Sequence, residues 1–366
     1  MSDTYYVFDE QAYIDFLSQV LQAYELTEEE ALVCAEVAAD AAKHGQESHE
    51  GAKLWHLLWD FLKPSGAVVP GAKAEPVRTL PSLEVWNGKR EIGPTVARRA
   101  TDRSIEMAQS TGVGIVCVYE TNHLLWGGSY ALRTAKANCI GGNICHAAAC
   151  QVVLHGGTRP TSGTHPFSLA FPLAEYPDFF LIDCGTSKMA FGSVEKYRRQ
   201  GKELPVGVAF DADCRPTVDP DSAKYVAVWG EHKGSGLNAF IEIVMAFFGG
   251  SSANIRCVKD LPDGERNTPC FLFGAISAEH LDHGDFAAGR TQAENVMAVV
   301  RAAIDESGGA RIPGLGKARA LESYHQHGGI LLSKGTVEHA EFGYRAMAKT
   351  TGVKLPTPLE KFSRKT

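Results

Sequence analysis

Residues 36–60 read EVAADAAKHGQESHEGAKLWHLLWD, and this stretch sets the pattern of the N-terminal part of the chain. Apolar residues recur at helical spacing on both sides of a polar centre. Within that centre His49 and Lys53 lie four positions apart, so a continuous helix would place them on one face. An imidazole beside an ammonium group can donate a proton to a polar bond while an anionic group is held nearby. The plain structural alternative is a solvated helix face that is interrupted at Gly45.

Size and composition place the chain among ordinary soluble proteins. Its 366 residues, of which 44% are hydrophobic and 22% charged, suffice for a sizeable core in one large or two moderate domains. The net charge of −7 and the lack of a basic run outside residues 361–365 disfavour nucleic acid as a partner. The sequence shows neither a leader in residues 1–10 nor an apolar run of membrane-spanning length, so we expect a cytoplasmic protein with no membrane contact.

The cysteines predict small buried side chains and not a disulfide framework. There are nine of them, an odd number, and they are spread through a large chain. Four of them cluster with a histidine but contain no C-x-x-C pair, so no metal site is predicted. These five residues are Cys139, Cys145, His146, Cys150 and Cys184. The sequence also contains no G-x-S-x-G or H-E-x-x-H motif.

The order of helix and strand patterns predicts an α+β fold. Helical periodicity marks both ends of the chain, and Thr27 followed by Glu30 forms a capping box at the start of a second helix. Short apolar and β-branched runs predict strands at residues 83–86, 114–119, 142–146, 167–171, 179–183 and 271–276. We therefore expect a helical domain built from residues 1–75 and 290–366, and a strand-rich central domain over residues 76–289.

Gly234, Gly236 and Ala239 formally match the dinucleotide-binding fingerprint G-x-G-x-x-A. Two features weaken the match. The tripeptide at residues 231–233 separates the preceding strand from the glycines, and no second strand ends in an acidic residue at the usual distance. The local chemistry remains informative, since Lys233 beside a glycine turn at a helix N-terminus suits a phosphate or a carboxylate.

Three further turns carry polar side chains at or near the ends of predicted strands. They are Thr121-Asn122-His123, Ser162-Gly-Thr164-His165-Pro166 and Asp183-Cys-Gly-Thr186-Ser187. Such turns can hold a cofactor phosphate or a catalytic network, although ordinary Asx and ST turns have the same composition. The residues by themselves thus predict proton transfer beside an anion-binding site.

Taken in chain order, these segments resemble the type-2 malate/L-lactate dehydrogenase family over almost the whole chain. That family includes ureidoglycolate and sulfolactate dehydrogenases, diketogulonate reductase and piperideine-2-carboxylate reductase. The resemblance is carried by Ser48-His49, Trp86-Asn-Gly88, Asn122-His123, Gly156-Gly157, Gly163-Thr164-x-Pro166, Asp183-x-x-Thr186-Ser187, Pro205-x-Gly207, Pro216-Thr217-x-Asp219-Pro220, Lys233-Gly234 and Arg311-x-Pro313-Gly314. It implies a non-Rossmann NAD(P)-binding fold, in which the glycines near residue 234 belong to a Lys-Gly turn.

The resemblance also implies a reaction in which hydride from NADH or NADPH reaches the carbon of a C=O or C=N bond. His49 would donate the proton, with Ser48 beside it and Asp183 supporting the donor or shaping the cofactor site. The substrate pocket would contain Lys53, Asn122, His123 and Thr164. The dinucleotide would be held by Thr186, Ser187, His165, Lys233, Gly234, Pro313 and Gly314. A homodimer, a small carboxylate substrate and the absence of a metal are implied as well.

Five places depart from the family pattern, among them the turn before the double glycine, which is Leu154-His155 where the family often has Pro-aromatic. Glu50 stands where the family has glycine, and Lys53 where it has the arginine that grips the substrate carboxylate. His165 replaces an asparagine and Ser193 a lysine. Lysine offers a point charge in place of a bidentate fork, so the grip on the carboxylate should differ. We expect an NAD(P)H-dependent reductase of a cyclic 2-imino acid or a 2-oxo acid; the alternatives are oxidative 2-hydroxy-acid dehydrogenation and a non-catalytic ligand-binding homologue.

Overall fold

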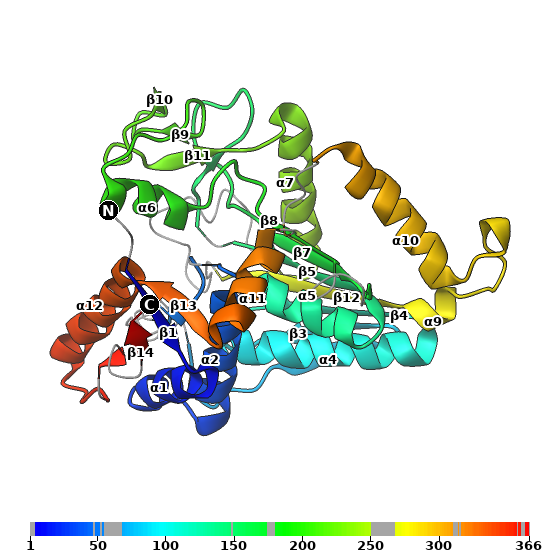
Figure 1. The fold of residues 1–366 in the computed structure, drawn as a ribbon, viewed down its shortest axis with the longest axis horizontal. Coiled ribbons are helices and arrows are strands. Elements are labelled where there is room, and N and C mark those ends of the chain that lie inside the picture. The colour runs from blue at the N-terminus through cyan, green and yellow to red at the C-terminus, as the bar shows by residue number, and fades with distance from the viewer. Residues whose placement is uncertain are drawn as a thin grey trace.

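The computed structural model (Figure 1) describes residues 4–46, 48–51, 53–54, 68–147, 149–173, 180–249, 268–309, 314, 316–356, 358–359 and 363–365. Helices and three β-sheets are distributed along these residues, which confirms the predicted α+β fold. A seven-stranded sheet forms the middle of the molecule. A four-stranded sheet lies above it in Figure 1, and a three-stranded sheet joins the two ends of the chain.

The seven-stranded sheet is mixed, with the strand order β2-β3-β4-β12-β5-β7-β8. Only β3 and β4 run parallel among its neighbouring pairs in the described part of the chain. The strands are β2 (Glu75–Leu80), β3 (Leu83–Asn87), β4 (Val113–Tyr119), β5 (Cys139–His146), β7 (Phe167–Phe171), β8 (Phe180–Cys184) and β12 (Cys270–Ser277). This arrangement differs from a doubly wound parallel sheet, so the predicted non-Rossmann fold is confirmed.

Helices cover both faces of this sheet, as the side-chain alternation along β12 shows. Phe271 and Phe273 are fully buried on the face covered by α4 (Gly93–Thr111) and α5 (Gly127–Lys136). Cys270 and Leu272 point to the opposite face and pack with α7 (Glu231–Ala246). Each buried aromatic ring contributes roughly 2–3 kcal/mol to stability, so this strand lies at the centre of the core.

The two ends of the chain share the three-stranded sheet. β1 (Tyr5–Phe8) pairs antiparallel with both β13 (Ile330–Ser333) and β14 (Ser363–Lys365). Four helices lie around it, blue and orange to red in Figure 1: α1 (Glu10–Gln22), α2 (Glu28–Lys43), α11 (Gly316–His327) and α12 (Lys334–Thr351). The predicted capping box at Thr27 and Glu30 begins α2. The sequence pattern does not predict the strands, because runs of three or four residues are too short to show alternation.

The segment after β12 packs on the central sheet, although the sequence groups residues 290–366 with the N-terminal helices. It contains α9 (Ala278–Leu281), η1 (Ala287–Gly289), α10 (Gln292–Ala303) and η2 (Asp305–Ser307). Met297 and Val300 of α10 form one buried cluster with Leu173 and with Phe180 of β8. The contacts of α10 are therefore with the edge of the large sheet.

The four-stranded sheet carries the residues that follow Asp183. Its order is β10-β9-β11-β6, formed by β6 (Val152–Val153), β9 (Ala209–Phe210), β10 (Pro216–Thr217) and β11 (Tyr225–Ala227). Helix α6 (Phe191–Gln200) packs on it through Val194, which is buried with Val152 and Val226. This small core fixes the position of the turn between β8 and α6.

The glycine motif at residues 234–239 lies inside a helix and not in a loop. α7 begins at Glu231, directly after Gly230, which has a left-handed φ of 64°. A Cβ atom on Gly234 would lie 1.6 Å from the carbonyl oxygen of Trp229, whereas one on Gly236 would meet nothing within 4 Å. Gly234 therefore permits a close approach of the backbone at the start of α7, and the strand–glycine loop–helix order of the dinucleotide fingerprint is not formed.

Among the described residues seven cysteines are free thiols and five of these are buried, as predicted. The prediction of a free buried thiol is wrong for Cys150, which is disulfide-bonded. No group of three or more metal-ligating side chains was found among the described residues. Within the same residues, no helix combines the length and the apolar composition that crossing a membrane requires.

Alanine at the two glycines of α7 should have opposite effects on stability. Gly234→Ala forces the Trp229 carbonyl to move and should lower the free energy of unfolding by about 2 kcal/mol or more. The methyl group added by Gly236→Ala meets open space in the same helix. This substitution should raise the free energy of unfolding by roughly 0.5–1 kcal/mol, because alanine has the higher helix propensity. Urea unfolding followed by circular dichroism measures both changes. Similar effects of the two substitutions would contradict the packing role of Gly234.

Candidate active site

The polar centre of the 36–60 stretch is not one continuous helix. α2 ends at Lys43, and Gly45 adopts a left-handed conformation with φ 66°. A short helical turn resumes at Gly51 and carries Lys53. The interruption at Gly45 agrees with the structural alternative, and His49 lies in the turn between the two helical pieces.

Two buried tyrosines hold the segment that carries His49. The Tyr13 hydroxyl on α1 accepts the Gly51 N–H (3.0 Å) and donates to the Glu50 carboxylate (3.0 Å). The Tyr344 hydroxyl on α12 donates to the Gly51 carbonyl oxygen. A Cβ atom on Gly51 would lie 2.4 Å from the Tyr13 hydroxyl, so the contact requires glycine. Glu50, the departure from the family pattern, thus takes part in this tyrosine contact.

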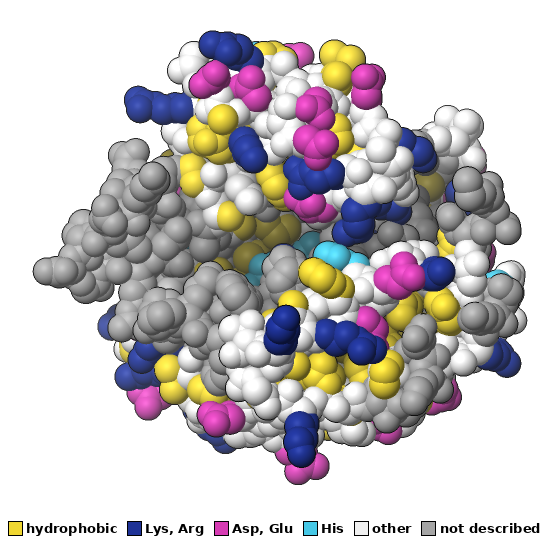
Figure 2. All heavy atoms as spheres, turned by 90° about the vertical axis from the view of Figure 1, so that its left-hand side faces the viewer, with side chains coloured by type: hydrophobic (Ala, Val, Ile, Leu, Met, Phe, Trp, Pro, Cys, Tyr) yellow, Lys and Arg dark blue, Asp and Glu magenta, His cyan; other side chains and the backbone are white. Residues whose placement is uncertain are grey.

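The His49 imidazole lies between a serine and a second histidine. Its Nδ1 is 2.7 Å from the Ser48 Oγ, and its ring stacks on that of His123 with centroids 5.6 Å apart. The Leu125 N–H donates to His123 Nδ1 (3.0 Å), which fixes the second ring. Figure 2 shows histidine side chains at the bottom of a hollow, with Lys and Arg side chains near its rim.

Burial and neighbouring charge lower the pKa of His49 to about 4. Burial is the main cause, because it disfavours the charged form. The ammonium groups of Lys53 and Lys317 lower the pKa further, and the Asp183 carboxylate opposes them. The imidazole of the ligand-free protein is therefore neutral near pH 7.

The Asp183 carboxylate at the end of β8 receives three donors from three different elements. Trp126, at the start of α5, donates its Nε1–H to Oδ2 (2.9 Å), and Ser168 of β7 donates its hydroxyl to Oδ1 (2.7 Å). Lys317 of α11 places its Nζ 3.0 Å from Oδ2. Burial would raise the pKa of Asp183, but the Lys317 ammonium and the hydrogen bonds outweigh it and hold the pKa below its ordinary value. Asp183 is a carboxylate at neutral pH.

Lys317 is the residue of this site that the sequence analysis does not identify. Its Nζ also donates to Gln46 Oε1 (2.5 Å) and lies 5.0 Å from the centre of the Trp126 ring. Gly314, with φ 102°, brings the chain to β8, since a Cβ atom there would lie 1.9 Å from the Leu181 carbonyl oxygen. The only sequence signal is the position of Lys317 just after the Pro-Gly turn, whose Pro313 lies outside the described residues.

The side chain of Asn122, a residue predicted in the substrate pocket, is hydrogen-bonded to backbone groups. Its Nδ2 donates to the Glu91 carbonyl oxygen (2.8 Å), and its Oδ1 accepts the Gly93 N–H (2.7 Å). A Cβ atom on Gly93 would lie 2.3 Å from the His123 carbonyl oxygen. The structure therefore gives the buried amide of Asn122 a role in positioning His123 against the start of α4.

The hydroxyl groups that follow Asp183 are also bonded within the protein. The Thr186 N–H and Oγ1 both donate to the Thr164 carbonyl oxygen (2.7 and 2.9 Å). Asn238 of α7 donates its Nδ2 to Thr186 Oγ1 (2.8 Å), and Ser187 donates its hydroxyl to the Met189 carbonyl oxygen (2.9 Å). These bonds hold the backbone of the turn after β8 and connect it to α7.

His165 and Lys233 have very different surroundings. The His165 ring is fully buried, with its Nε2 bonded to Glu242 and 2.8 Å from the Ser162 Oγ. Lys233 is exposed in the first turn of α7, next to the buried Gly234. The buried His165 can therefore support a binding site only indirectly, without contacting a ligand, whereas the Lys233 ammonium is accessible to solvent.

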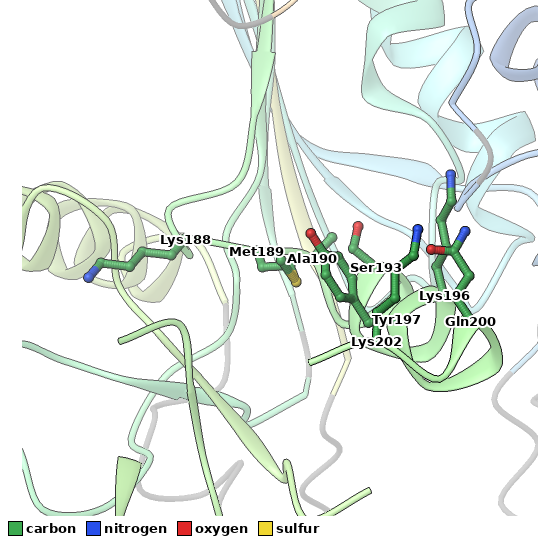
Figure 3. Close-up of a pocket in the computed structure, with 8 residues that line it drawn as sticks. All are labelled: Lys188, Met189, Ala190, Ser193, Lys196, Tyr197, Gln200 and Lys202. Carbon is green, nitrogen blue, oxygen red and sulfur yellow. The ribbon is translucent and has the colours of Figure 1, made fainter. Parts of the chain in front are cut away.

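A pocket of about 580 Å³ lies along α6. The start of this helix contacts the His49 segment, because a Cβ atom on Gly192 would lie 3.0 Å from the Ser48 Cβ. The pocket is lined by Lys188, Met189, Ala190, Ser193, Lys196, Tyr197, Gln200 and Lys202. Figure 3 shows Lys188 extending away from Lys196, Gln200 and Lys202. Its charged lining is cationic, so the pocket suits a ligand with negative charge.

Comparison with solved structures finds the same fold in several dehydrogenases. The chain superimposes on malate dehydrogenase from Entamoeba histolytica with a TM-score of 0.80 and 23% identity, covering 96% of this chain and 99% of that one. Sulfolactate dehydrogenase from Methanocaldococcus jannaschii gives 0.76 and 24%, covering 95% and 98%. Delta1-piperideine-2-carboxylate reductase from Pseudomonas syringae pvar. tomato gives 0.77 and 23%, covering 92% and 99%.

Sequence comparison supports the same grouping. The chain is 28% identical to a 2,3-diketo-L-gulonate reductase of Salmonella paratyphi B over 316 residues, which is 85% of this chain and 92% of that protein. A protein of the same name from Klebsiella oxytoca is 28% identical over 306 residues, or 82% and 89%. The family model described as malate/L-lactate dehydrogenase matches residues 8–340. The chain therefore belongs to the malate/L-lactate dehydrogenase family and is an oxidoreductase.

Proposed function

We propose that the protein is an NAD(P)H-dependent reductase of the C=O bond of a 2-oxo acid or the C=N bond of a cyclic 2-imino acid. The observation that carries the proposal is the His49 site, where an imidazole adjoins two ammonium groups and a buried carboxylate. Relatives named as a diketogulonate reductase and a piperideine-2-carboxylate reductase support this substrate range. All such substrates carry a carboxylate next to the bond that is reduced.

In this proposal each group of the site has a separate role. His49 donates a proton to the substrate oxygen or nitrogen, and Ser48 holds its Nδ1 at 2.7 Å. Lys53 holds the substrate carboxylate as a point charge. His123 stacks on the donor ring and restricts its orientation. Asp183 keeps Trp126 and the Lys317 ammonium in place around the pocket.

The side chains along α6 support the binding of a nicotinamide dinucleotide. Lys196 and Lys202, with Ser193 and Gln200, line a pocket that has no carboxylate in its lining, as a diphosphate requires. The Lys233 ammonium, exposed at the start of α7, is a further group that could reach a phosphate. The turn that follows Asp183, together with Gly314, would provide the backbone surface that lies against the cofactor. When bound, the nicotinamide supplies the hydride; the protein residues bind and orient it and provide the proton.

Oxidative dehydrogenation of a 2-hydroxy acid is the second candidate, and one observation favours it. The depressed pKa of His49 leaves its imidazole neutral near pH 7, which is the form that acts as a general base. The same residues would then run the reaction in reverse, with His49 accepting the hydroxyl proton. The two candidates differ in the nucleotide that is consumed: the reductase consumes NADH or NADPH, and the dehydrogenase consumes the oxidised form.

Consumption of NADH and NADPH with a linear 2-oxo acid and with a cyclic imino acid tests the reductase directly. We expect His49→Ala to lower kcat by roughly 10²–10⁴-fold, because the general acid is lost. The exposed His283→Ala serves as the matched control and should leave turnover unchanged. Unchanged turnover in His49→Ala would refute its role as donor. Failure of the protein to bind either nucleotide would favour the non-catalytic alternative.

The His49 ring should titrate with a pKa near 4, far below its ordinary value of 6.5. Between these pH values the unfolded chain binds a proton that the folded protein does not. The stability that His49 contributes is therefore complete above pH 6.5 and is lost as the pH falls through 4. NMR titration of the histidine ring protons, assigned by the signal lost in His49→Gln, measures the pKa. A midpoint between pH 6 and 7 in the ligand-free protein would contradict the electrostatic description of the site.

We further propose that the protein is a homodimer that uses α7. Phe240, Ile243 and Phe247 lie three and four positions apart on one stripe of this helix and are 55%, 57% and 88% exposed. Ile241 and Met245 on the other side are buried against the sheet. A helix that is apolar on two sides needs a second surface to cover it.

Light scattering coupled to size-exclusion chromatography tests the dimer. The double substitution Phe240→Ser and Phe247→Ser should shift the protein from the dimer to the monomer mass, because it removes the apolar stripe. Val206→Ser changes an equally exposed apolar residue in a loop and should leave the mass unchanged. A monomer mass for the unsubstituted protein, or a dimer that survives the double substitution, would count against this interface.

A further inference from the structure

Hydrogen bonds connect the Asp183 carboxylate to the His49 ring through three intervening side chains. The Lys317 ammonium lies 3.0 Å from Asp183 Oδ2 and 2.5 Å from Gln46 Oε1. The amide nitrogen of Gln46 is 3.3 Å from Ser48 Oγ, which is 2.7 Å from His49 Nδ1. The five side chains therefore form one continuous chain, which starts at a largely buried carboxylate and ends at the proposed proton donor.

The donor character of Lys317 fixes the direction of the first hydrogen bonds in this chain. An ammonium group has N–H donors and no acceptor, so only the carbonyl oxygen of the Gln46 amide can face it. The NH₂ group of Gln46 therefore faces Ser48, and this group can only donate. Lys317 is held in place for this role, since its side chain is 13% exposed and its ammonium also lies 5.0 Å from the centre of the Trp126 ring.

The Ser48 hydroxyl transmits this direction to the imidazole. It accepts a hydrogen bond from Gln46 Nε2, so its own single hydrogen remains for His49 Nδ1. Nδ1 is then the acceptor, and a neutral ring carries its hydrogen on Nε2. The reverse tautomer would direct two donors, one from Gln46 and one from His49, at the Ser48 oxygen. It would also leave the serine hydrogen without a partner among the described residues, which is unfavourable.

We propose that Gln46 and Lys317 are positioning residues that set the tautomer of His49, so that the neutral ring presents an Nε2–H to the substrate pocket. Within the described part of the chain, no hydrogen-bond partner is found for His49 Nε2, so this hydrogen is available to a ligand. The inference deepens the proposed reductase function, on which its consequence for the reaction rests.

The tautomer decides which substrate group the neutral His49 ring can recognise. A C=O oxygen or an unprotonated C=N nitrogen offers a lone pair and needs a donor, which Nε2–H provides. Removal of a proton from the hydroxyl of a 2-hydroxy acid needs a bare Nε2 instead. Before any proton is transferred, the ligand-free site therefore suits the reduction rather than the oxidation.

NMR of the ligand-free protein tests the tautomer. The protein is produced with ¹⁵N-labelled, protonated histidine in a deuterated background. Two-bond ¹H–¹⁵N correlation spectra then distinguish a protonated from a bare ring nitrogen. Between about pH 8 and 9 an imidazole with the ordinary pKa of about 6.5 is neutral, and an imidazolium would show both nitrogens protonated. The signals of His49 are assigned by their loss in His49→Gln, and we expect the pattern of the Nε2–H tautomer.

Gln46→Glu should invert the tautomer with almost no change in shape. A carboxylate only accepts hydrogen bonds, so Lys317 keeps its partner while Ser48 turns its hydrogen toward residue 46. His49 Nδ1 then donates to Ser48 Oγ, and the spectrum should change to that of the Nδ1–H tautomer. Gln19→Glu adds the same charge at an exposed position of α1 and is the matched control, which should leave the His49 signals unchanged.

Two further variants show whether the effect passes through Ser48. Ser48→Ala interrupts the hydrogen-bond chain, so adding Gln46→Glu to it should no longer invert the tautomer of His49. Gln46→Met removes the amide without adding a charge, and it replaces Gln46→Glu if that variant does not fold. In Gln46→Met the Nδ1–H fraction should rise roughly fivefold, as expected for the loss of one hydrogen bond.

Three results would overturn the proposal: an Nδ1–H tautomer in the unsubstituted protein, a tautomer that is unchanged in the folded residue 46 variant, or an inversion that persists in the Ser48→Ala background. The reductase function is tested separately by NAD(P)H oxidation. A protein whose tautomer inverts in Gln46→Glu but which oxidises neither nucleotide keeps the tautomer assignment and loses the proposed reaction. Turnover by a protein whose tautomer is independent of residue 46 does the opposite.

Discussion

The hydrogen-bonded carboxylate of Asp183 is the interaction on which the site depends. A buried carboxylate is costly unless it is paired and hydrogen-bonded, and here the donors come from Trp126, Ser168 and Lys317. These residues belong to the start of α5, to β7 and to α11, so one side chain fixes the central sheet relative to the C-terminal segment. Removing any donor leaves a largely buried charge with fewer partners.

The site lies where three parts of the fold meet. Helices α1 and α12 hold the His49 segment through Tyr13 and Tyr344, the large sheet supplies Asp183, and the turn before α4 positions the second histidine. Chemistry therefore depends on packing between elements that are far apart in the sequence. The arrangement places two ammonium groups and the Asp183 carboxylate beside a neutral imidazole.

Sequence patterns predicted the fold class and several of its details. Helical and strand periodicity, the capping box at Thr27 and the weak dinucleotide fingerprint at Gly234 all have local causes, so they are visible in the sequence. The hydrogen bonds of Asn122 to backbone groups and the presence of Lys317 in the site are not visible in the sequence, because tertiary contacts set the partners of both residues. Nothing distinguishes a lysine that pairs with a buried carboxylate from one that faces solvent until the two segments are brought together.

The pairing of β1 with β13 and β14 has a consequence for how the protein folds during synthesis. Strand β1 has no sheet partner until residues 330–333 and 363–365 have left the ribosome. The Tyr344 contact with the His49 segment likewise forms between distant parts of the chain. Contacts of such long sequence separation form slowly and leave apolar surface exposed in the meantime. The N-terminal segment therefore acquires these contacts only after almost the entire polypeptide has been synthesised.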